Sequence, residues 1–268
     1  MAGDALGDEV GQWLNDNWSD DRSLLEWRGI LADAGWGCPT WPTQWWGRGL
    51  SPARSALVEA EFSRFGAVGA APGQGVTLAG ATILEHGSDD VKARFLRQAQ
   101  TGEHRWCQLF SEPGSGSDLA GLTTKAELDG DEWVISGQKA WNTSAHKANF
   151  GMLLARTNFD VPKHRGITYF LVEMRQPGIE VRPLMAMNRY ASFNEVFLNE
   201  ARVPAGNIVG SVGEGWRPAS TTLASERFLP STRRMSAAEG DRSGRCHQEA
   251  REEANDYFAT YNRTSAAR

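Results

Sequence analysis

The sequence is poor in several features that mark particular classes of protein. Its 28 Lys and Arg residues are outnumbered by 33 Asp and Glu, so the basic stripe of a nucleic-acid-binding protein is missing. The three cysteines, Cys38, Cys107 and Cys246, lie far apart without metal-ligand spacing, as expected of reduced thiols. No apolar run could cross a bilayer, and no N-terminal signal pattern is present. We therefore expect a cytoplasmic protein without a nucleic-acid partner, a metal site or a membrane span.

Apolar residues and tryptophan are plentiful by contrast. Hydrophobic residues make up 40% of the 268 residues, which is enough for a globular core, and eleven residues are tryptophan. Most tryptophans are expected in a core or an interface. A carbohydrate-binding β-domain with exposed tryptophans is an alternative, but most tryptophans precede residue 47, outside the region with strand patterns.

The first part of the chain has the pattern of α-helices. From residue 8 onward, apolar residues recur at helical spacing, and Ser51 with Pro52 has the form of a helix start. Residues 76–86 indicate a buried helix that ends at Gly87, since glycine is a natural residue just after a helix end. We therefore predict an all-α domain over residues 1–104.

The pattern changes at Trp106. Residues 123–128 and 132–136 flank Asp129 and Gly130, a strong hairpin signal, and further short apolar stretches follow. This predicts a small β-barrel or sandwich domain over 105–212, so the chain is of the α+β class.

The C-terminal part has two predicted segments. Residues 213–230 are predicted to be the first helix of another helical domain. Residues 231–268 hold few large apolar side chains, so we expect a poorly ordered tail with one weak helix over 248–259.

One stretch, residues 106–118, combines an apolar half with a half made mainly of Pro, Gly, Ser and Asp. A strand that runs into such a loop gathers backbone N–H groups at one point. The hydroxyls of Ser115 and Ser117 lie among them. The stretch therefore predicts an anion cradle suited to phosphate, with a plain surface turn as the alternative.

Four motifs, in order, resemble those of the flavin-dependent acyl-CoA dehydrogenases. They lie at residues 110–118, at 130–143, at 194–198 with 202–207, and at 213–216 with 223–227. The resemblance implies an N-terminal helical domain and a middle β-domain that binds FAD. The implied reaction is dehydrogenation of an acyl-CoA thioester to a trans-2-enoyl-CoA, with electron-transfer flavoprotein as acceptor.

The resemblance also implies roles for individual residues. Ser111 would lie near the flavin ring, Trp141 beside it, and Thr143 at flavin N5, while Ser117 would lie near the pyrophosphate and the acyl-CoA. The full set of implied cofactor-binding residues is Gln108, Phe110, Ser111, Gly116, Ser117, Trp141, Asn142 and Thr143. The implied substrate contacts are Ser117, Glu226 and Arg227.

The reaction needs a base for the α-proton, and a carboxylate suits this task. Glu226 directly precedes Arg227, as the base does in some branches of the family. In other branches the base lies further along the chain, and Glu226 would then be one half of a solvated charge pair. Glu112 is a weaker candidate.

Three departures from the family pattern keep other hypotheses open. The sequence is not recognisable as the family's C-terminal helical domain after residue 230. The run Trp141–Ala145 lacks the usual glycine, and the loop 187–192 differs from the common form. The protein is then an active enzyme, a non-catalytic subunit that needs a full-length partner chain, or a degenerate fragment. A homo-oligomer or a hetero-oligomer with another family chain is expected.

Overall fold

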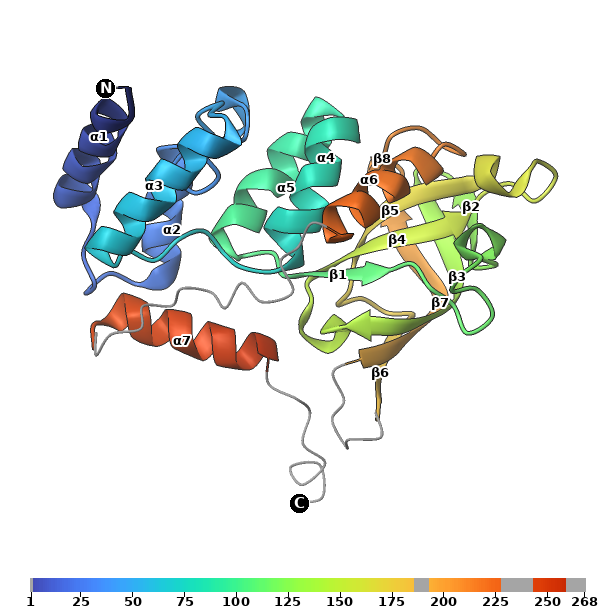
Figure 1. Cartoon of the computed structure of the whole chain (residues 1–268). Coiled ribbons are helices and arrows are strands. Elements are labelled where there is room, and N and C mark those ends of the chain that lie inside the picture. The colour runs from blue at the N-terminus through green and yellow to red at the C-terminus, as the bar shows by residue number, and fades with distance from the viewer. Residues whose placement is uncertain (1, 186–192, 228–242, 259–268) are drawn as a thin grey trace, which may run out of the picture. The chain divides into compact units, whose positions relative to one another are not determined.

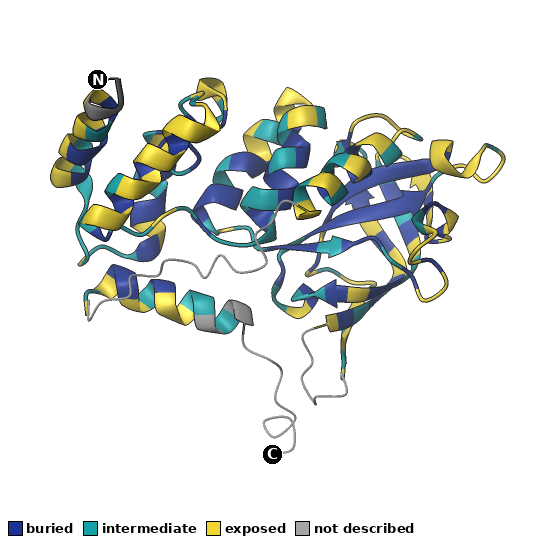
Figure 2. Cartoon of the chain, viewed as in Figure 1, coloured by how far each residue is buried: buried dark blue, intermediate teal, exposed yellow. Residues whose placement is uncertain are grey.

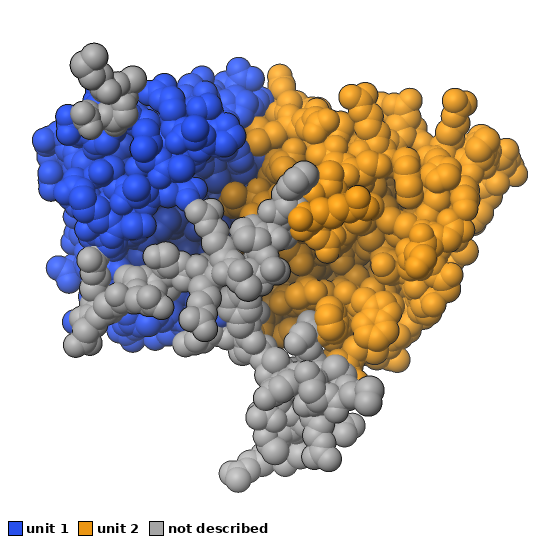
Figure 3. All heavy atoms as spheres, viewed as in Figure 1, with its two compact units in different colours: residues 1–72, 93–103, 229–256 blue, residues 73–92, 104–228, 257–268 orange. Residues whose placement is uncertain are grey.

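A computed structural model describes residues 2–185, 193–227 and 243–258 (Figure 1). The chain divides into two compact units (Figure 3). Unit 1 comprises residues 1–72, 93–103 and 229–256, and unit 2 comprises residues 73–92, 104–228 and 257–268. Residues 73–92, expected in the helical domain, thus group with the β-region. Within the described residues, no helix is long and apolar enough to span a membrane.

The helices of unit 1 begin and end where local chemistry favours it. They are α1 (Ala2–Asn17), α2 (Leu24–Asp33), the short η1 (Thr43–Trp45), α3 (Pro52–Phe65) and most of α5 (Asp89–Thr101). The predicted start of α3 is confirmed, since the Ser51 side chain accepts a hydrogen bond from the Arg54 N–H and Pro52 opens the helix. The helix ends at Gly66, whose φ of 65° is left-handed.

Tryptophan rings fill the core of unit 1. Trp27 is fully buried, and its ring lies 4.7 Å from that of Trp18 and 5.7 Å from that of Trp13. Five of the eleven tryptophans are buried and five are half-buried, so about half of them are core residues. Of all tryptophans in the described chain, only Trp141 is exposed.

Part of the tail forms a helix that packs within unit 1, which differs from the expected poor order. Helix α7 (Arg245–Phe258) begins three residues before the expected weak helix and covers it as far as Phe258. The Glu249 carboxylate accepts a hydrogen bond from the Leu24 N–H at 2.7 Å, at the start of α2. Arg28, 2% exposed, holds both carboxylate oxygens of Glu253, at 2.9 and 2.6 Å. The rest of the tail, 231–242 and 259–268, lies outside the described residues.

Unit 2 begins with a π-helical segment, η2 (Gly75–Gly80), which continues into α4 (Ala81–His86). The single helix predicted over 76–86 is therefore partly wrong in type. The predicted end of the helix at Gly87 is confirmed, and the φ of this residue is −72°. Glycine is needed there because a Cβ atom would lie 2.7 Å from the Ile83 carbonyl oxygen.

The strands of unit 2 form one eight-stranded sheet. They are β1 (Trp106–Leu109), β2 (Lys125–Asp129), β3 (Glu132–Thr143), β4 (Phe150–Arg156), β5 (Ile167–Glu173), β6 (Ile179–Leu184), β7 (Phe193–Pro204) and β8 (Ile208–Val209). The order is β6-β7-β3-β2-β4-β5-β8, and β1 lies parallel to β4. The predicted hairpin is confirmed: Asp129 pairs with Glu132, and Gly130 has a φ of 65°.

The core of this sheet lies around β4 and β5, which are buried almost throughout (Figure 2). Cys107, Leu153 and Phe170 are fully buried there, and the Trp133 ring meets Phe170 edge-on at 5.4 Å. Helix α6 (Trp216–Arg227) completes the unit. The predicted α+β fold, helical first and then a β-domain, is confirmed.

Candidate functional site

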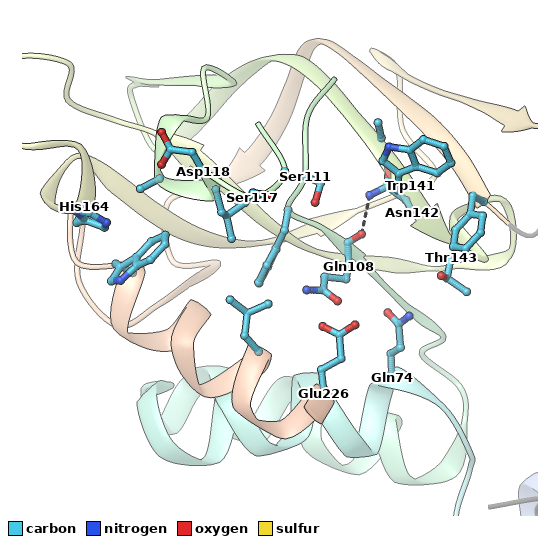
Figure 4. A pocket seen from close by; sticks show the side chains of 18 residues that line it. Gln74, Gln108, Ser111, Ser117, Asp118, Trp141, Asn142, Thr143, His164 and Glu226 are labelled. Carbon is cyan, nitrogen blue, oxygen red and sulfur yellow. Dashed lines mark hydrogen bonds between the residues drawn. The ribbon is translucent and has the colours of Figure 1, made fainter. Parts of the chain in front are cut away.

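A cavity of about 530 Å³ lies within unit 2 (Figure 4). All of the cofactor-binding residues named from the sequence line it, together with Glu226: Gln108, Phe110, Ser111, Gly116, Ser117, Trp141, Asn142 and Thr143. Arg227, the last residue of α6, does not line it. Segments as distant in sequence as β1 and α6 are thus brought to one space.

The loop after β1 is tied to β3 by a series of hydrogen bonds. The Asn142 side-chain Nδ2 donates to the Gln108 carbonyl oxygen at 2.7 Å, and the Ala140 N–H donates to the Ser111 carbonyl oxygen at 2.9 Å. A third bond joins the same segments, since the Lys139 ammonium donates to the Phe110 carbonyl oxygen at 3.1 Å. These bonds fix the part of the cavity wall formed by residues 108–111 against β3.

Glu112 and Lys139 form a buried ion pair next to this wall. The Nζ–Oε1 distance is 2.9 Å, and the Lys139 side chain is fully buried. Glu112 also accepts hydrogen bonds from the backbone N–H groups of Thr123 and Thr124 at 2.7 and 2.8 Å. Burial tends to raise the pKa of Glu112, but the charge of Lys139 and these hydrogen bonds outweigh it and lower the pKa to about 2. The Glu112 carboxylate stabilises the loop and does not line the cavity. This argues against Glu112 as the base that takes the α-proton.

Because of this ion pair, we expect the fold to lose stability in acid. Because the pKa of Glu112 in the folded state, about 2, lies below its ordinary 4.5, its stabilising contribution is complete above pH 4.5 and is lost as the pH falls toward 2. The loss amounts to about 3 kcal/mol in the free energy of unfolding. The free energy of unfolding, measured with urea at a series of pH values, should depend less on pH in Glu112→Gln than in the wild type. The exposed control Glu127→Gln should keep the pH dependence of the wild type. Equal slopes in all three proteins would contradict this role.

The two cradle hydroxyls differ in role. Ser115 is 4% exposed and donates its hydroxyl to the Asp118 carbonyl oxygen at 2.7 Å, so its predicted place in an anion cradle is wrong. Ser117 is exposed and lines the cavity. At Gly116 a Cβ atom would meet nothing within 4 Å, so the space beside the loop is open to a ligand.

Trp141 is presented by a strained backbone. Its φ of 63° is left-handed, and the β3–β7 register shifts between Lys139 and Asn142, which marks a bulge. Such a conformation costs on the order of 1 kcal/mol for a bulky residue. The bulge leaves the ring 64% exposed, edge-on to Phe193 at 5.8 Å. Strain that exposes an aromatic ring at a cavity fits a ligand-stacking role.

The turn after Thr143 forms without the family's glycine. Ser144 adopts the left-handed conformation, with a φ of 56°, and Ala145 is buried. The other unusual loop, 187–192, lies outside the described residues.

The opposite end of the cavity is held by charged side chains. Arg156, 5% exposed, donates to the carbonyl oxygens of Ala120 and Lys163 at 2.6 and 3.1 Å, and so fixes η3 (Leu119–Gly121) and η5 (Lys163–Arg165). The Lys163 ammonium donates to both oxygens of Asp118, at 2.7 and 2.9 Å. This bond lowers the pKa of Asp118.

Helix α6 is joined to the body of unit 2 through buried hydroxyls. Thr222 Oγ1 lies 2.7 Å from Thr82 Oγ1 and 3.1 Å from Tyr169 Oη, and all three residues are fully buried. Glu226 follows Thr222 by four residues, on the same side of the helix. Its carboxylate points toward the Gln108 amide across the cavity, and its side chain is exposed (Figure 4).

Two polar residues of the lining were not identified from the sequence. His164 belongs to η5 and meets the Trp216 ring edge-on at 4.7 Å. Gln74 precedes η2, and its buried Oε1 has no hydrogen-bond partner in the structure as described; the same holds for Asn142 Oδ1. No sequence pattern marks either position, because both depend on contacts between distant segments. Unpartnered amide oxygens and an exposed ring fit a ligand with polar and aromatic parts.

Family models match both parts of the chain. The acyl-CoA dehydrogenase N-terminal domain matches residues 4–103, and the acyl-CoA dehydrogenase middle domain matches residues 107–201. Members of this family are flavoproteins that normally bind FAD, and they are oxidoreductases.

Individual proteins agree with these matches. Acyl-CoA dehydrogenase FadE34 of Mycobacterium tuberculosis is 50% identical over 207 residues, 75% of this chain and 28% of that protein. The Tcur3481-Tcur3483 steroid ACAD has 28% identity and a TM-score of 0.63 over 84% of this chain and 61% of that chain. The ChsE4-ChsE5 complex from Mycobacterium tuberculosis has 28% identity and a TM-score of 0.62, over 84% and 60%.

The chain spans less than two thirds of the length of each of these proteins. The two structures are complexes of different acyl-CoA dehydrogenase chains. The resemblance read from the four motifs is confirmed. By its two matched domains and its relatives, this chain belongs to the acyl-CoA dehydrogenase family.

Proposed function

We propose that unit 2 binds FAD and a CoA thioester in its cavity and takes part in dehydrogenation of the acyl group to a trans-2-enoyl-CoA. The observation that carries this proposal is the convergence of β1, the following loop, the end of β3 and α6 on one cavity. Residues separated by more than a hundred positions supply its walls. A surface turn at 110–118 would not need this arrangement.

The chemistry of the lining suits FAD. Trp141 offers an exposed ring for stacking, and the hydroxyls of Ser111 and Thr143 and the amide of Asn142 offer polar contacts. The open space at Gly116 lets the pyrophosphate approach the loop. When bound, FAD supplies the acceptor for the hydride that leaves the β-carbon of the acyl group.

Glu226 is the proposed base. A carboxylate at the cavity can take the α-proton of the thioester, and binding of the flavin and acyl group would remove water from it. Ser117 would contact the CoA part from the opposite wall. Arg227 lies outside the cavity and would act on the substrate only as a nearby positive charge.

A second chain is part of the proposal. The similar structures join two different acyl-CoA dehydrogenase chains, and this chain corresponds to about 60% of one of them. We propose that it assembles with itself or with another such chain and that electrons pass to an electron-transfer flavoprotein. The alternative is a non-catalytic subunit, or a degenerate chain, that retains the cavity without turnover.

Flavin titration tests the binding step. Trp141→Ala should weaken FAD binding about fivefold, because it removes a stacking surface worth about 1 kcal/mol. Phe159→Ala is the matched control, an exposed aromatic residue outside the cavity lining, and should leave the Kd unchanged. The Kd would be measured from quenching of FAD fluorescence. Equal Kd values for the wild type and Trp141→Ala would remove Trp141 from the site.

A further inference from the structure

The end of the cavity near Glu226 is more polar than the binding of a plain acyl chain requires. Figure 4 shows the Gln74 amide and the Glu226 carboxylate directed into the same space, with the Gln108 amide beside them. We infer that Gln74 is a specificity residue that hydrogen-bonds a hydroxyl or oxo group on the acyl chain. The substrate class would then be acyl-CoA thioesters with a polar group on the acyl part. This inference rests on the proposed function.

The first argument is the hydrogen-bonding state of the Gln74 amide. Its Oε1 is shielded from solvent and has no partner among the described residues. A buried polar group without a hydrogen bond is costly, so each such group in a native protein calls for a partner, which can be a water, an ion or a ligand. Asn142 also lines the cavity with a free Oδ1, but its Nδ2 is engaged by the Gln108 carbonyl oxygen at 2.7 Å. The position of the Asn142 amide is therefore explained in part by its bond within the cavity wall. The position of the Gln74 amide has no such explanation.

The second argument is the backbone beneath Gln74. The residue directly precedes η2, and π-helical segments are rare and are frequent at functional sites. The Thr77 hydroxyl donates to the Gly73 carbonyl oxygen at 2.9 Å and braces this start. The helix that continues from η2 is bonded to α6 through Thr82 and Thr222 at 2.7 Å. Gln74 and Glu226 thus stand on segments joined by a buried contact, which fixes the amide relative to the proposed base.

The third argument is selectivity. Phe110 and Leu223 supply apolar surface for the chain of an acyl group, and Gln74 adds a polar point. A few polar groups in a mostly apolar pocket fix the orientation of a ligand. A pocket that contains an amide without a hydrogen-bond partner discriminates against a plain alkyl chain, because such a chain cannot form a hydrogen bond with the amide.

Thioester binding to the FAD-loaded chain tests the inference without turnover. Calorimetric Kd values would be compared for hexanoyl-CoA and for hydroxyhexanoyl-CoA with the hydroxyl on the fourth, fifth or sixth carbon. The wild type should bind at least one hydroxylated thioester about tenfold more tightly than hexanoyl-CoA. Gln74→Leu should abolish this preference, chiefly by tighter binding of hexanoyl-CoA. Gln98→Leu is the control, since Gln98 Oε1 is also buried and unpartnered but lies outside the cavity lining.

The outcomes separate the inference from the proposed function. If the thioesters bind but none of the hydroxylated ones is preferred, or if Gln74→Leu keeps the preference, the inference is overturned and the function stands. If Gln74→Leu weakens FAD binding and leaves the preference intact, the amide belongs to the cofactor and the inference is also overturned. If the FAD-loaded chain binds no CoA thioester, the proposed function fails and the inference with it.

Discussion

Replacement of Glu226 by Gln is expected to lower the rate at which an acyl-CoA reduces the bound flavin by about 100- to 10,000-fold, the usual contribution of a general base. The amide keeps the size of the side chain and removes its capacity to accept the α-proton. The rate would be followed anaerobically by stopped-flow absorbance. FAD binding should remain close to that of the wild type, because Glu226 is exposed and its substitution removes no contact from the core.

The matched control for this substitution is Glu214→Gln. Glu214 is exposed, precedes α6 and does not line the cavity, so the same loss of charge there should leave the rate unchanged. If Glu226→Gln reduces the flavin as fast as the wild type, the base lies elsewhere. Glu226 would then be the solvated member of the Glu226–Arg227 pair.

The second large effect is expected from Lys139→Met. The substitution leaves the Glu112 carboxylate buried without its counter-charge, and breaking such a pair typically lowers the free energy of unfolding by about 3–5 kcal/mol. It also frees the Phe110 carbonyl oxygen, so the loop that forms the cavity wall should loosen and FAD binding should weaken. Urea unfolding and FAD fluorescence would measure the two effects.

Two variants control for the loss of a lysine charge. Lys125→Met breaks an exposed pair with Glu127 and should change the stability by less than about 1 kcal/mol. The double variant Lys139→Met with Glu112→Gln should recover part of the loss, because no unpaired charge remains. An effect of Lys139→Met no larger than that of Lys125→Met would contradict the role given to the buried pair.

The parts of the site that could be predicted are those whose chemistry is local in sequence. Residues 110–118 show their turn residues in one run, whereas the roles of Trp141 and Thr143, at the end of β3, could be named only through the family resemblance. The fold class followed from the change of periodicity at Trp106 for the same reason. Glu226 could be named only through the family resemblance, since a Glu-Arg pair on a helix is common.

The rest depends on contacts between distant residues. Ser115 and Ser117 look equivalent in sequence. Only the structure shows that the Ser115 hydroxyl is bonded to the Asp118 carbonyl oxygen, whereas Ser117 lines the cavity. The packing of α7 depends on Arg28 and Glu253, which are 225 positions apart. Gln74 is one residue of a Gly- and Pro-rich interruption, and its place in the cavity follows from the way η2 and α6 pack.

The visible spectrum of the chain, loaded with FAD and freed of excess, tests the central claim most directly. The account predicts the absorption bands of a bound, oxidised flavin, and their bleaching when a suitable acyl-CoA is added without oxygen. Bound flavin that does not bleach with any acyl-CoA would favour the non-catalytic subunit. A colourless protein after loading would contradict the claim that unit 2 binds FAD.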